Sequence, residues 1–391
     1  MKQAAQSVYL QAHRGIHMPR ENHLSPGAAL IAVLTAIVVG ILASLAIRPP
    51  GAVVDPAALA SDSGAREQVR WRVQSAYGVN LPVIGKNLPR LISDLKAVSA
   101  NNIQLELFEP GELVPILEIT ESVKEAKIQA GYVWVGYDQG RIPASTLISA
   151  VPFGMEPTEF AAWWYYGGGR ALGESLYHEH DVQPILCAIS GPETAGWFRE
   201  PITSLDDLVG LKIRFAGLGG KVLQRLGASV TIIPGGETFQ ALEKGAIDAS
   251  EFSLPIVDEM LGFGRVAKFN YFPGWHQPFS AVHLLVNLQV WNDLTQETKD
   301  LFHLACRASV TDSMAHTGAT QGEVIKNFAD HGITASTLPM DILEALREVA
   351  EEVLDEEAGK DEHFAKILAS QRAFSESYGY WKRMGFLPRD F

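Results

Sequence analysis

Cysteine is scarce in this chain. Two of its 391 residues are cysteines, Cys187 and Cys306, and no C-x-x-C pair occurs. That absence excludes the zinc and dithiol redox centres that depend on such spacing. Cys187 lies in an apolar stretch typical of a strand and Cys306 in a helical one, so at most one intramolecular disulfide could form. We expect two buried free thiols rather than a bridge.

The sequence also lacks the common signatures of catalysis. There is no G-x-S-x-G elbow and no H-E-x-x-H helix. The glycine-rich stretch 217–220 lies between a predicted strand and a predicted helix, but Val222 breaks the dinucleotide pattern G-x-G-x-x-G. His178 and His180 are two residues apart and therefore point to different faces of a helix. We expect neither nucleotide binding nor enzymatic activity.

Positive charge is in short supply. The chain has 32 lysines and arginines against 45 acidic residues, a formal net charge of −13. The first 50 residues carry four bases and one acid, so the remainder has a net charge of −16. Such a surface argues against nucleic acid as a partner and against an anionic membrane face.

One long apolar run stands near the N-terminus. Residues 27–47 are uncharged and number enough to cross a bilayer as a helix. The basic residues of segment 1–26 predict that this segment stays in the cytoplasm. Two interpretations remain open, a cleaved signal peptide and a retained membrane anchor, and both export the rest of the chain. Residues 48–66 are rich in proline, alanine, glycine and serine, which is typical of a linker.

The exported part alternates strand and helix patterns. A strand near Trp71, a helix over 87–97 and a strand from Ile103 predict a parallel βαβ unit. The same alternation returns over 204–250, which predicts a second α/β lobe. Helical patterns over 295–330 and from Asp341 onward predict long C-terminal helices.

Four polar residues follow predicted strands or lie in loops within apolar sequence. They are Arg214, Glu251, Gln277 and Glu193. Ligands of open α/β sheets bind beyond the carboxyl ends of the strands. These residues are therefore candidates for ligand contacts, although each type is also common in surface loops.

Several motifs share one order and spacing along the chain. They are Gly111–Pro115, Ala150–Met155, Trp164–Gly169, Gly196–Arg199, Asp207–Arg214, Gly217–Gly220, Pro234–Glu237, Gly245–Ala249 and Pro273–His276. Together they resemble the solute-binding subunits of TRAP transporters, and among these the members that bind 2-oxo acids or lactate. The resemblance runs from about Arg70 to the C-terminal helices.

The resemblance implies an α/β periplasmic-binding-protein clamshell, in which two lobes joined by a hinge close on a ligand. Lobe I would comprise 67–187 and 277–325, and lobe II 188–276 and 326–391. The ligand would be a small 2-oxo or 2-hydroxy monocarboxylate, delivered to the TRAP permease in the membrane. The protein would be periplasmic, free or tethered to the cytoplasmic membrane. Long C-terminal helices like those through which some relatives dimerise imply a homodimer.

Arg214 occupies the position of the carboxylate-binding arginine in this family. A guanidinium group presents a planar pair of donors that matches a carboxylate and stays charged when buried. The other interpretation of Arg214 is an ion pair with a neighbouring acid of the protein.

The resemblance also implies a metal ion beside the ligand, held by Glu193, Glu251, the backbone carbonyl of Phe252, and Gln277. The sequence departs from the family pattern in two ways: a glutamine and a glutamate have exchanged positions, and Phe252 replaces a tryptophan. The set remains one of hard oxygen donors, which suit Na⁺ or Ca²⁺. Two glutamates, one arginine and a monocarboxylate sum to −2, which a divalent ion would neutralise.

Aromatic residues are expected to complete the substrate pocket. Besides Arg214, the predicted substrate contacts are Glu193, Phe252, Tyr77 and Tyr132, whereas core packing is the expected role of Trp134. A membrane-anchored sensor for a different organic acid is the alternative function. It would lack a permease encoded nearby.

Overall fold

A computed structural model describes residues 25–47 and 67–387 of the chain. It divides into two compact units, 1–66 and 67–391, which we describe separately. The described part of the first unit is helix α1 (Pro26–Ile47), with exposed side chains from Val33 to Ser44. Within the part of the chain that the structure describes, no helix meets the length and hydropathy of a membrane span. Most of the predicted cytoplasmic segment and the linker 48–66 lie outside the described residues.

The second unit alternates strands and helices through most of its length. Its strands are β1 (Val69–Ser75), β2 (Ile103–Phe108), β3 (Ala130–Trp134), β4 (Val182–Ser190), β5 (Gly196–Phe198), β6 (Lys212–Arg214), β7 (Ser229–Thr231), β8 (Ala249–Ser250), β9 (Phe269–Phe272), β10 (Ser280–Asn287) and β11 (Thr334–Thr337). Its helices are α3 (Asn87–Val98), α4 (Ile119–Lys124), α5 (Pro157–Tyr166), α6 (Gly169–His178), α7 (Leu218–Arg225), α8 (Gly235–Glu243), α9 (Pro255–Leu261), α10 (Leu288–Asn292), α11 (Gln296–Asn327), α12 (Met340–Ala358) and α13 (Glu362–Gly385).

The first sheet has the strand order β2-β1-β3-β10-β4. Strand β1 pairs in parallel with β2, with Val69 opposite Ile103, and in parallel with β3 on its other side. This confirms the predicted βαβ unit, whose crossover is α3. Strand β10 returns antiparallel between β3 and β4 and is buried along its whole length.

The second sheet has the order β11-β9-β5-β8-β6-β7. Its β6 strand pairs in parallel with both β7 and β8, so the ends of these short strands meet at one edge. Ser204 caps a short 3-10 helix over Leu205–Leu208. Gly210 follows with a φ of 76°, a conformation that glycine adopts without strain.

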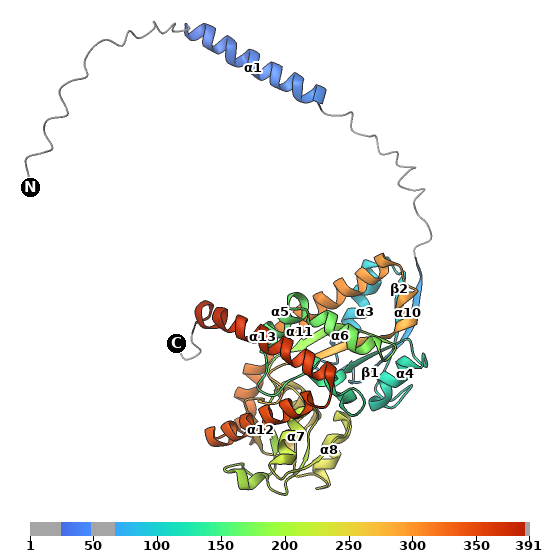
Figure 1. The fold of residues 1–391 in the computed structure, drawn as a ribbon, viewed down its shortest axis with the longest axis vertical. Helices are drawn as coiled ribbons and strands as arrows, with labels where there is room; N and C mark the ends of the chain where they lie inside the picture. The colour runs from blue at the N-terminus through green and yellow to red at the C-terminus, as the bar shows by residue number, and fades with distance from the viewer. Residues whose placement is uncertain (1–24, 48–66, 388–391) are drawn as a thin grey trace, which may run out of the picture. The chain divides into compact units, whose positions relative to one another are not determined.

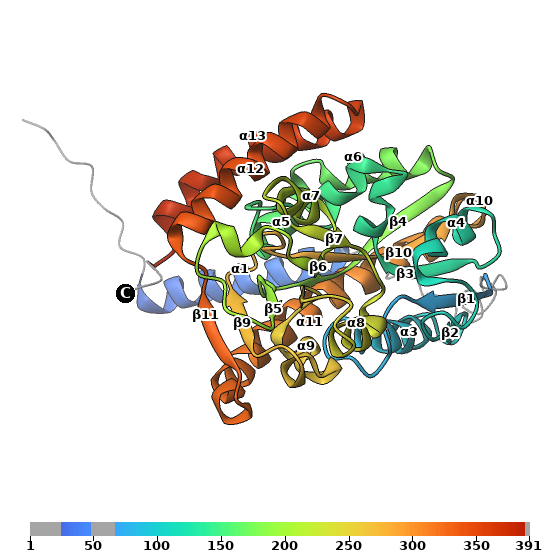
Figure 2. The same cartoon turned by 90° about the horizontal axis from the view of Figure 1, so that it is seen from below.

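The chain passes between the two sheets more than once. Residues 191–195 lead from β4 to β5, residues 273–279 lead back from β9 to β10, and α11 leads to β11. Helices α12 and α13 then run along the outside of the unit (Figures 1 and 2). Helix α12 packs on α7, whereas α13 packs against α5 and α6, with Gln371 Nε2 donating to the Leu147 carbonyl at 2.6 Å. The predicted α/β fold with long C-terminal helices is confirmed.

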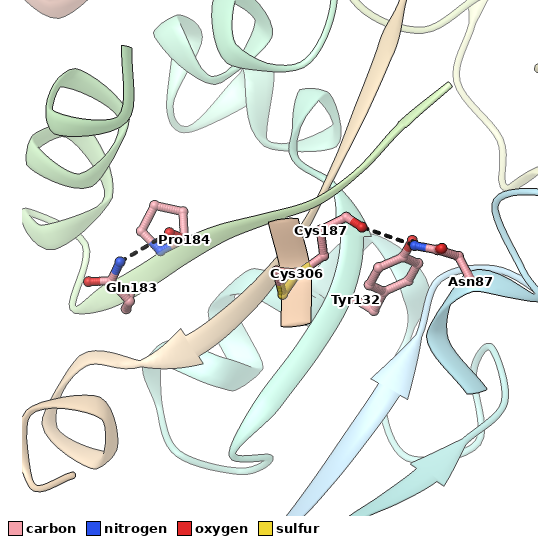
Figure 3. The surroundings of a disulfide bond; sticks show 6 residues. All are labelled: Asn87, Tyr132, Gln183, Pro184, Cys187 and Cys306. Carbon is pink, nitrogen blue, oxygen red and sulfur yellow. Dashed lines mark hydrogen bonds between the residues drawn. A yellow bond between two sulfur atoms is a disulfide. The ribbon is translucent and has the colours of Figure 1, made fainter. Parts of the chain in front are cut away.

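The prediction of two free thiols is wrong. Cys187 on β4 and Cys306 on α11 form a disulfide across 119 residues of sequence, with Cα atoms 4.2 Å apart (Figure 3). Periodicity assigned each cysteine to its element correctly, but it does not reveal that α11 lies along β4. Next to the bridge, Asn87 Nδ2 donates to the Cys187 carbonyl and to the Tyr132 hydroxyl, both at 3.0 Å. The bridge and Asn87 together tie α3, β3, β4 and α11.

We expect reduction of this bridge to lower the free energy of unfolding by about 2–5 kcal/mol, because the open chain regains the entropy of a long closed loop. Denaturant unfolding with and without a reducing agent measures the difference. A Cys187→Ser/Cys306→Ser variant is the control, because its stability should not respond to the reductant. Equal stability of the oxidised and reduced wild-type protein would contradict this expectation.

Candidate functional site

The four polar residues predicted from the sequence meet at one cavity beside the segments that cross between the sheets. Arg214 ends β6, Glu251 follows β8, Glu193 lies in the first crossing and Gln277 in the second. All four are at most 5% exposed. The cavity is lined by Tyr77, Ile84, Trp134, Tyr137, Glu193, Arg214, Ala216, Glu251, Phe252, Ser253, Gln277, Ser280 and Val282.

The guanidinium of Arg214 is paired within the protein. Its Nη1 donates to the Glu251 carboxylate oxygen Oε1 at 2.6 Å and to the Glu251 backbone carbonyl at 2.7 Å. Its Nε donates to the Ile233 carbonyl at 3.1 Å, and its Cζ lies 5.4 Å from the centre of the Phe252 ring. The ion pair that the sequence left open as an alternative is therefore present, at the edge of the cavity.

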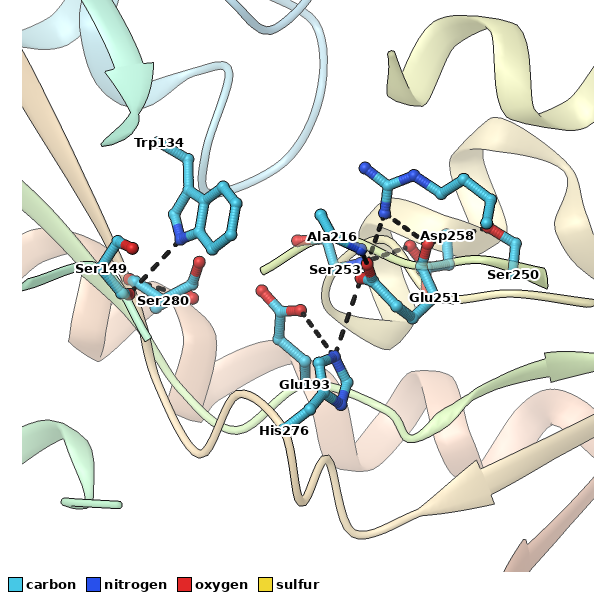
Figure 4. A network of polar contacts seen from close by, with 12 residues as sticks. Trp134, Ser149, Glu193, Ala216, Ser250, Glu251, Ser253, Asp258, His276 and Ser280 are labelled. Carbon is cyan, nitrogen blue, oxygen red and sulfur yellow. Dashed lines mark hydrogen bonds and ion pairs between the residues drawn. The ribbon is translucent and has the colours of Figure 1, made fainter. Parts of the chain in front are cut away.

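The two oxygens of Glu251 have different surroundings. Oε1 accepts from Arg214 and from the backbone N–H of Ala216 at 2.7 Å, whereas Oε2 has no hydrogen-bond partner. Burial acts to raise the pKa of Glu251, but the charge of Arg214, the neighbouring His276 and the Ala216 N–H together hold this pKa below the usual value. Figure 4 shows His276 facing Glu251, and its Nε2 lies 3.7 Å from Oε2, beyond hydrogen-bond distance.

Among the described residues, no lysine or arginine forms an ion pair with Glu193; His276 Nε2 lies 4.0 Å from its Oε2. Burial, and then the charges of Glu251 and Asp258, raise the pKa of Glu193 well above the usual value. The Gln277 amide stands beside it: oriented with its NH₂ toward Glu193, it donates to the two carboxylate oxygens at 2.9 and 3.1 Å. In the opposite orientation, the Gln277 amide oxygen lies at the same distances from the two carboxylate oxygens of Glu193. Three oxygens this close together require a positive charge or a proton between them.

A buried hydrogen-bond network holds the loop that carries Glu251 and Phe252. Asp258, in α9, accepts from the Trp197 indole N–H at 2.8 Å and from the Ser253 N–H at 3.1 Å. The Phe252 ring covers Gly235, where a side chain would collide with it. The loop is thereby fixed against the second sheet.

Of the aromatic residues considered for the pocket, Tyr77 and Trp134 line the cavity and Tyr132 does not. Tyr77 lines the cavity, and Ser75 Oγ accepts its backbone N–H at 3.0 Å. Tyr132 does not line this cavity, because its hydroxyl points to Asn87 instead. Trp134, expected in the core, is 4% exposed and also lines the cavity, where its edge meets the ring of Tyr137.

The glycine-rich stretch 217–220 serves close packing. A Cβ atom on Gly217 would lie 3.0 Å from the Trp134 ring, which comes from the first sheet. A Cβ on Gly219 would lie 2.6 Å from the Cβ of His276. These glycines thus allow the second sheet to approach Trp134 and the second crossing.

Two residues at the site were missed in the sequence. Tyr137 lies three residues beyond Trp134, and burial raises the pKa of its hydroxyl. His276 is 1% exposed, and its Nε2 lies 3.7 Å from Glu251 Oε2 and 4.0 Å from Glu193 Oε2. The signal for His276 was its position directly before Gln277 in a stretch of buried aromatic residues.

The donor set fits a cation. Glu193, Glu251 and the Gln277 amide oxygen supply hard oxygen donors, and Glu251 Oε2 is buried without a partner. Burial and the repulsion from Glu251 and Asp258 raise the pKa of Glu193, and a positive charge here would offset both. Phe252 lines the same cavity, next to Glu251.

The chain is similar to known binding proteins over most of its length. Residues 80–361 match the model of the bacterial extracellular solute-binding protein family 7. A monocarboxylate 2-oxoacid-binding periplasmic protein from a Nostoc species is 32% identical over 321 residues, which cover 82% of this chain and 87% of that protein.

Two solved structures have the same fold. A TRAP transporter solute-binding protein from Bordetella bronchiseptica, a dimer with copurified calcium and picolinate, has a TM-score of 0.80 and 29% identity, covering 81% of this chain and 95% of that one. One from Pseudoalteromonas atlantica with bound sodium and pyruvate has a TM-score of 0.78 and 30% identity, covering 81% and 97%. The chain thus belongs to family 7 of the bacterial extracellular solute-binding proteins, the solute-binding subunits of TRAP transporters.

Proposed function

We propose that this protein captures a small 2-oxo or 2-hydroxy monocarboxylate outside the cytoplasm and delivers it to a TRAP permease. The observation that carries the proposal is a buried arginine, Arg214, at the edge of a cavity between two sheets. The 2-oxoacid-binding relative and the pyruvate-bound structure agree with this ligand class. The apolar side chains of Ile84 and Val282 in the lining favour a short ligand over a polar or sugar acid.

Binding requires an exchange of carboxylates at Arg214. Glu251 Oε1 now accepts from Arg214 Nη1 at 2.6 Å. A ligand carboxylate replaces this contact, while the Ile233 carbonyl keeps the guanidinium in place through Nε. Tyr77 and Tyr137 supply hydroxyl groups for the 2-oxo or 2-hydroxy oxygen.

The freed Glu251 needs a new partner, because an unpaired buried charge is strongly unfavourable. Glu193, Glu251, Gln277 and the Phe252 carbonyl are the residues that would hold Na⁺ or Ca²⁺. The ion would supply the positive charge that lets both glutamates stay ionised beside the ligand. Ion binding and ligand binding then strengthen each other.

The lobe boundaries and the partners extend the proposal. Lobe I (67–187 and 277–325) and lobe II (188–276 and 326–391) would close on the ligand about the crossing segments, although α13 contacts the first lobe.

The exposed side chains of Tyr380, Trp381 and Met384 on α13 favour a homodimer. Segment 27–47 would serve as a signal peptide or an anchor, and the protein would bind without catalysis.

A membrane-anchored sensor for a different acid remains the second candidate. It requires that segment 27–47 is retained as an anchor instead of being cleaved as a signal peptide. Neighbouring genes that encode no permease would support the sensor.

Replacing Arg214 by Ala should weaken pyruvate binding at least about 30-fold, the loss expected when a buried charge pair is broken. Isothermal titration calorimetry measures the affinity. Because Arg214→Ala leaves Glu251 as an unpaired buried charge, the double variant Arg214→Ala/Glu251→Gln is measured alongside it.

The matched control is Arg225→Ala, because Arg225 is exposed and pairs with glutamates of α12 away from the cavity. It should bind pyruvate as the wild type does. Unchanged pyruvate affinity in a folded variant lacking Arg214 would rule out the proposed carboxylate contact.

Removal of metal should weaken pyruvate binding, and added Ca²⁺ should restore it, because the ion compensates the charge of the displaced Glu251. Thermodynamic linkage requires pyruvate to raise the Ca²⁺ affinity by the same factor. Calorimetry with the ligands added in both orders tests this equality. The same pyruvate affinity in EDTA and in Ca²⁺ would refute the coupling.

A further inference from the structure

A second cavity lies on the side of the first sheet, where the junction of α5 and α6 meets strand β4 and helix α11. Arg170, Arg307, His303, Tyr165 and Trp164 line it, together with three residues of β4. It shares no lining residue with the cavity of the candidate site. The two arginines and the histidine lie outside the motifs that resemble TRAP solute-binding subunits, so the resemblance assigns them no role. We call this cavity the arginine pocket.

Arg307 brings an unpaired positive charge to the arginine pocket. Its side chain, on α11, is exposed and forms no ion pair with any acid of the described residues. Its Cζ lies 4.4 Å from the centre of the Tyr165 ring, so the guanidinium covers the ring face. A contact with a ring face leaves the guanidinium N–H groups available to an acceptor.

The Tyr165 hydroxyl is a second group without a partner. Its oxygen is buried and makes no hydrogen bond to any described residue. Burial raises the pKa of this hydroxyl, and the charges of Arg307 and Arg170 oppose that effect, so both guanidinium groups lie near it. Because a buried hydroxyl without a partner is unfavourable, an acceptor from outside the chain would fit here.

Arg170, at the start of α6, faces the pocket from the other side. Its Nε donates to Glu174 Oε1 at 2.8 Å, and its Nη2 lies 2.9 Å from His303 Nε2. Burial and then the charge of Arg170 lower the pKa of His303 to about 4, so the neutral imidazole accepts from Arg170 at pH 7. Of the two acids that act on His303, Glu174 pairs with Arg170 and Asp300 accepts from Gln296 at 2.8 Å. The second arginine of the pocket is left without an acid.

We propose that the arginine pocket is a second ligand site, which binds an oxyanion between Arg170 and Arg307. The guanidinium groups would present N–H donors to its oxygens, and the Tyr165 hydroxyl would donate a further hydrogen bond. Sulfate, phosphate and carboxylate groups all have this chemistry, whether the ion is free or the group belongs to an acidic side chain of another protein. The inference goes beyond the proposed function and does not depend on it.

The direct test is an NMR titration of the purified full-length protein, labelled with ¹³C in its histidine rings, with sulfate at constant ionic strength. Pyruvate and Na⁺ are kept in excess to occupy the candidate site. Sulfate should shift the His303 signal saturably, whereas the signal of His331, exposed beside Glu259, should not move. The loss of one signal in His303→Gln assigns it. Because a bound anion favours the protonated imidazole, sulfate should also raise the pKa of His303 above about 4.

Variants separate the pocket from general attraction of anions to positive charge. Arg307→Gln should weaken sulfate binding at least about 10-fold, because it removes charge-assisted hydrogen bonds. Tyr165→Phe, which keeps every charge, should weaken it about 3-fold or more. The matched control Arg225→Gln removes the same charge on α7, where the side chain pairs with a glutamate of α12, and should bind sulfate as the wild type does. All three should bind pyruvate normally.

Acetate titrated in the same way distinguishes the two sources of the oxyanion. Tighter binding of sulfate would support a free dianion as the ligand, and tighter binding of acetate would support a carboxylate such as an acidic side chain. The absence of a saturable His303 shift with either ion would overturn the proposal. So would equal sulfate affinity in the wild type and Arg307→Gln, or an equal loss in Arg225→Gln.

Discussion

The buried pairing of Arg214 with Glu251 is the interaction on which the rest of the site depends. Both residues are 1% exposed, so neither charge can remain without a partner. Glu193 adds a second acid that nothing in the described residues neutralises, and its pKa is raised accordingly. The site therefore has two acids, Glu193 and Glu251, for one arginine. This excess of negative charge suits a protein that binds an anion together with a metal ion.

The fold places the charged residues of the site between the two sheets. Glu193 and Gln277 lie on two of the segments that cross between the sheets, whereas Arg214 and Glu251 lie at the ends of strands of the second sheet. The Trp134 ring of the first sheet packs over Gly217 of the second. A ligand held by Arg214, as we propose, would contact residues of both sheets, and its binding energy would help to hold the sheets together.

The sequence predicted the helices and strands, and it singled out the four polar residues, because these depend on local patterns: strand alternation, helical periodicity and positions after strands or in loops. It could not predict contacts between distant elements. The disulfide between β4 and α11 was missed for this reason, and Tyr132 was assigned to the pocket although its strand directs it to Asn87. His276 was missed because a single buried histidine has no spacing pattern, and only the fold brings it to two glutamates.

The most direct test of this account is a crystal structure of the protein with pyruvate and a divalent ion bound. The account predicts that Arg214 Nη1 leaves Glu251 Oε1 for the ligand carboxylate, and that Glu251 turns to the ion. A ligand carboxylate bound elsewhere, with the Arg214–Glu251 contact of 2.6 Å intact, would contradict it.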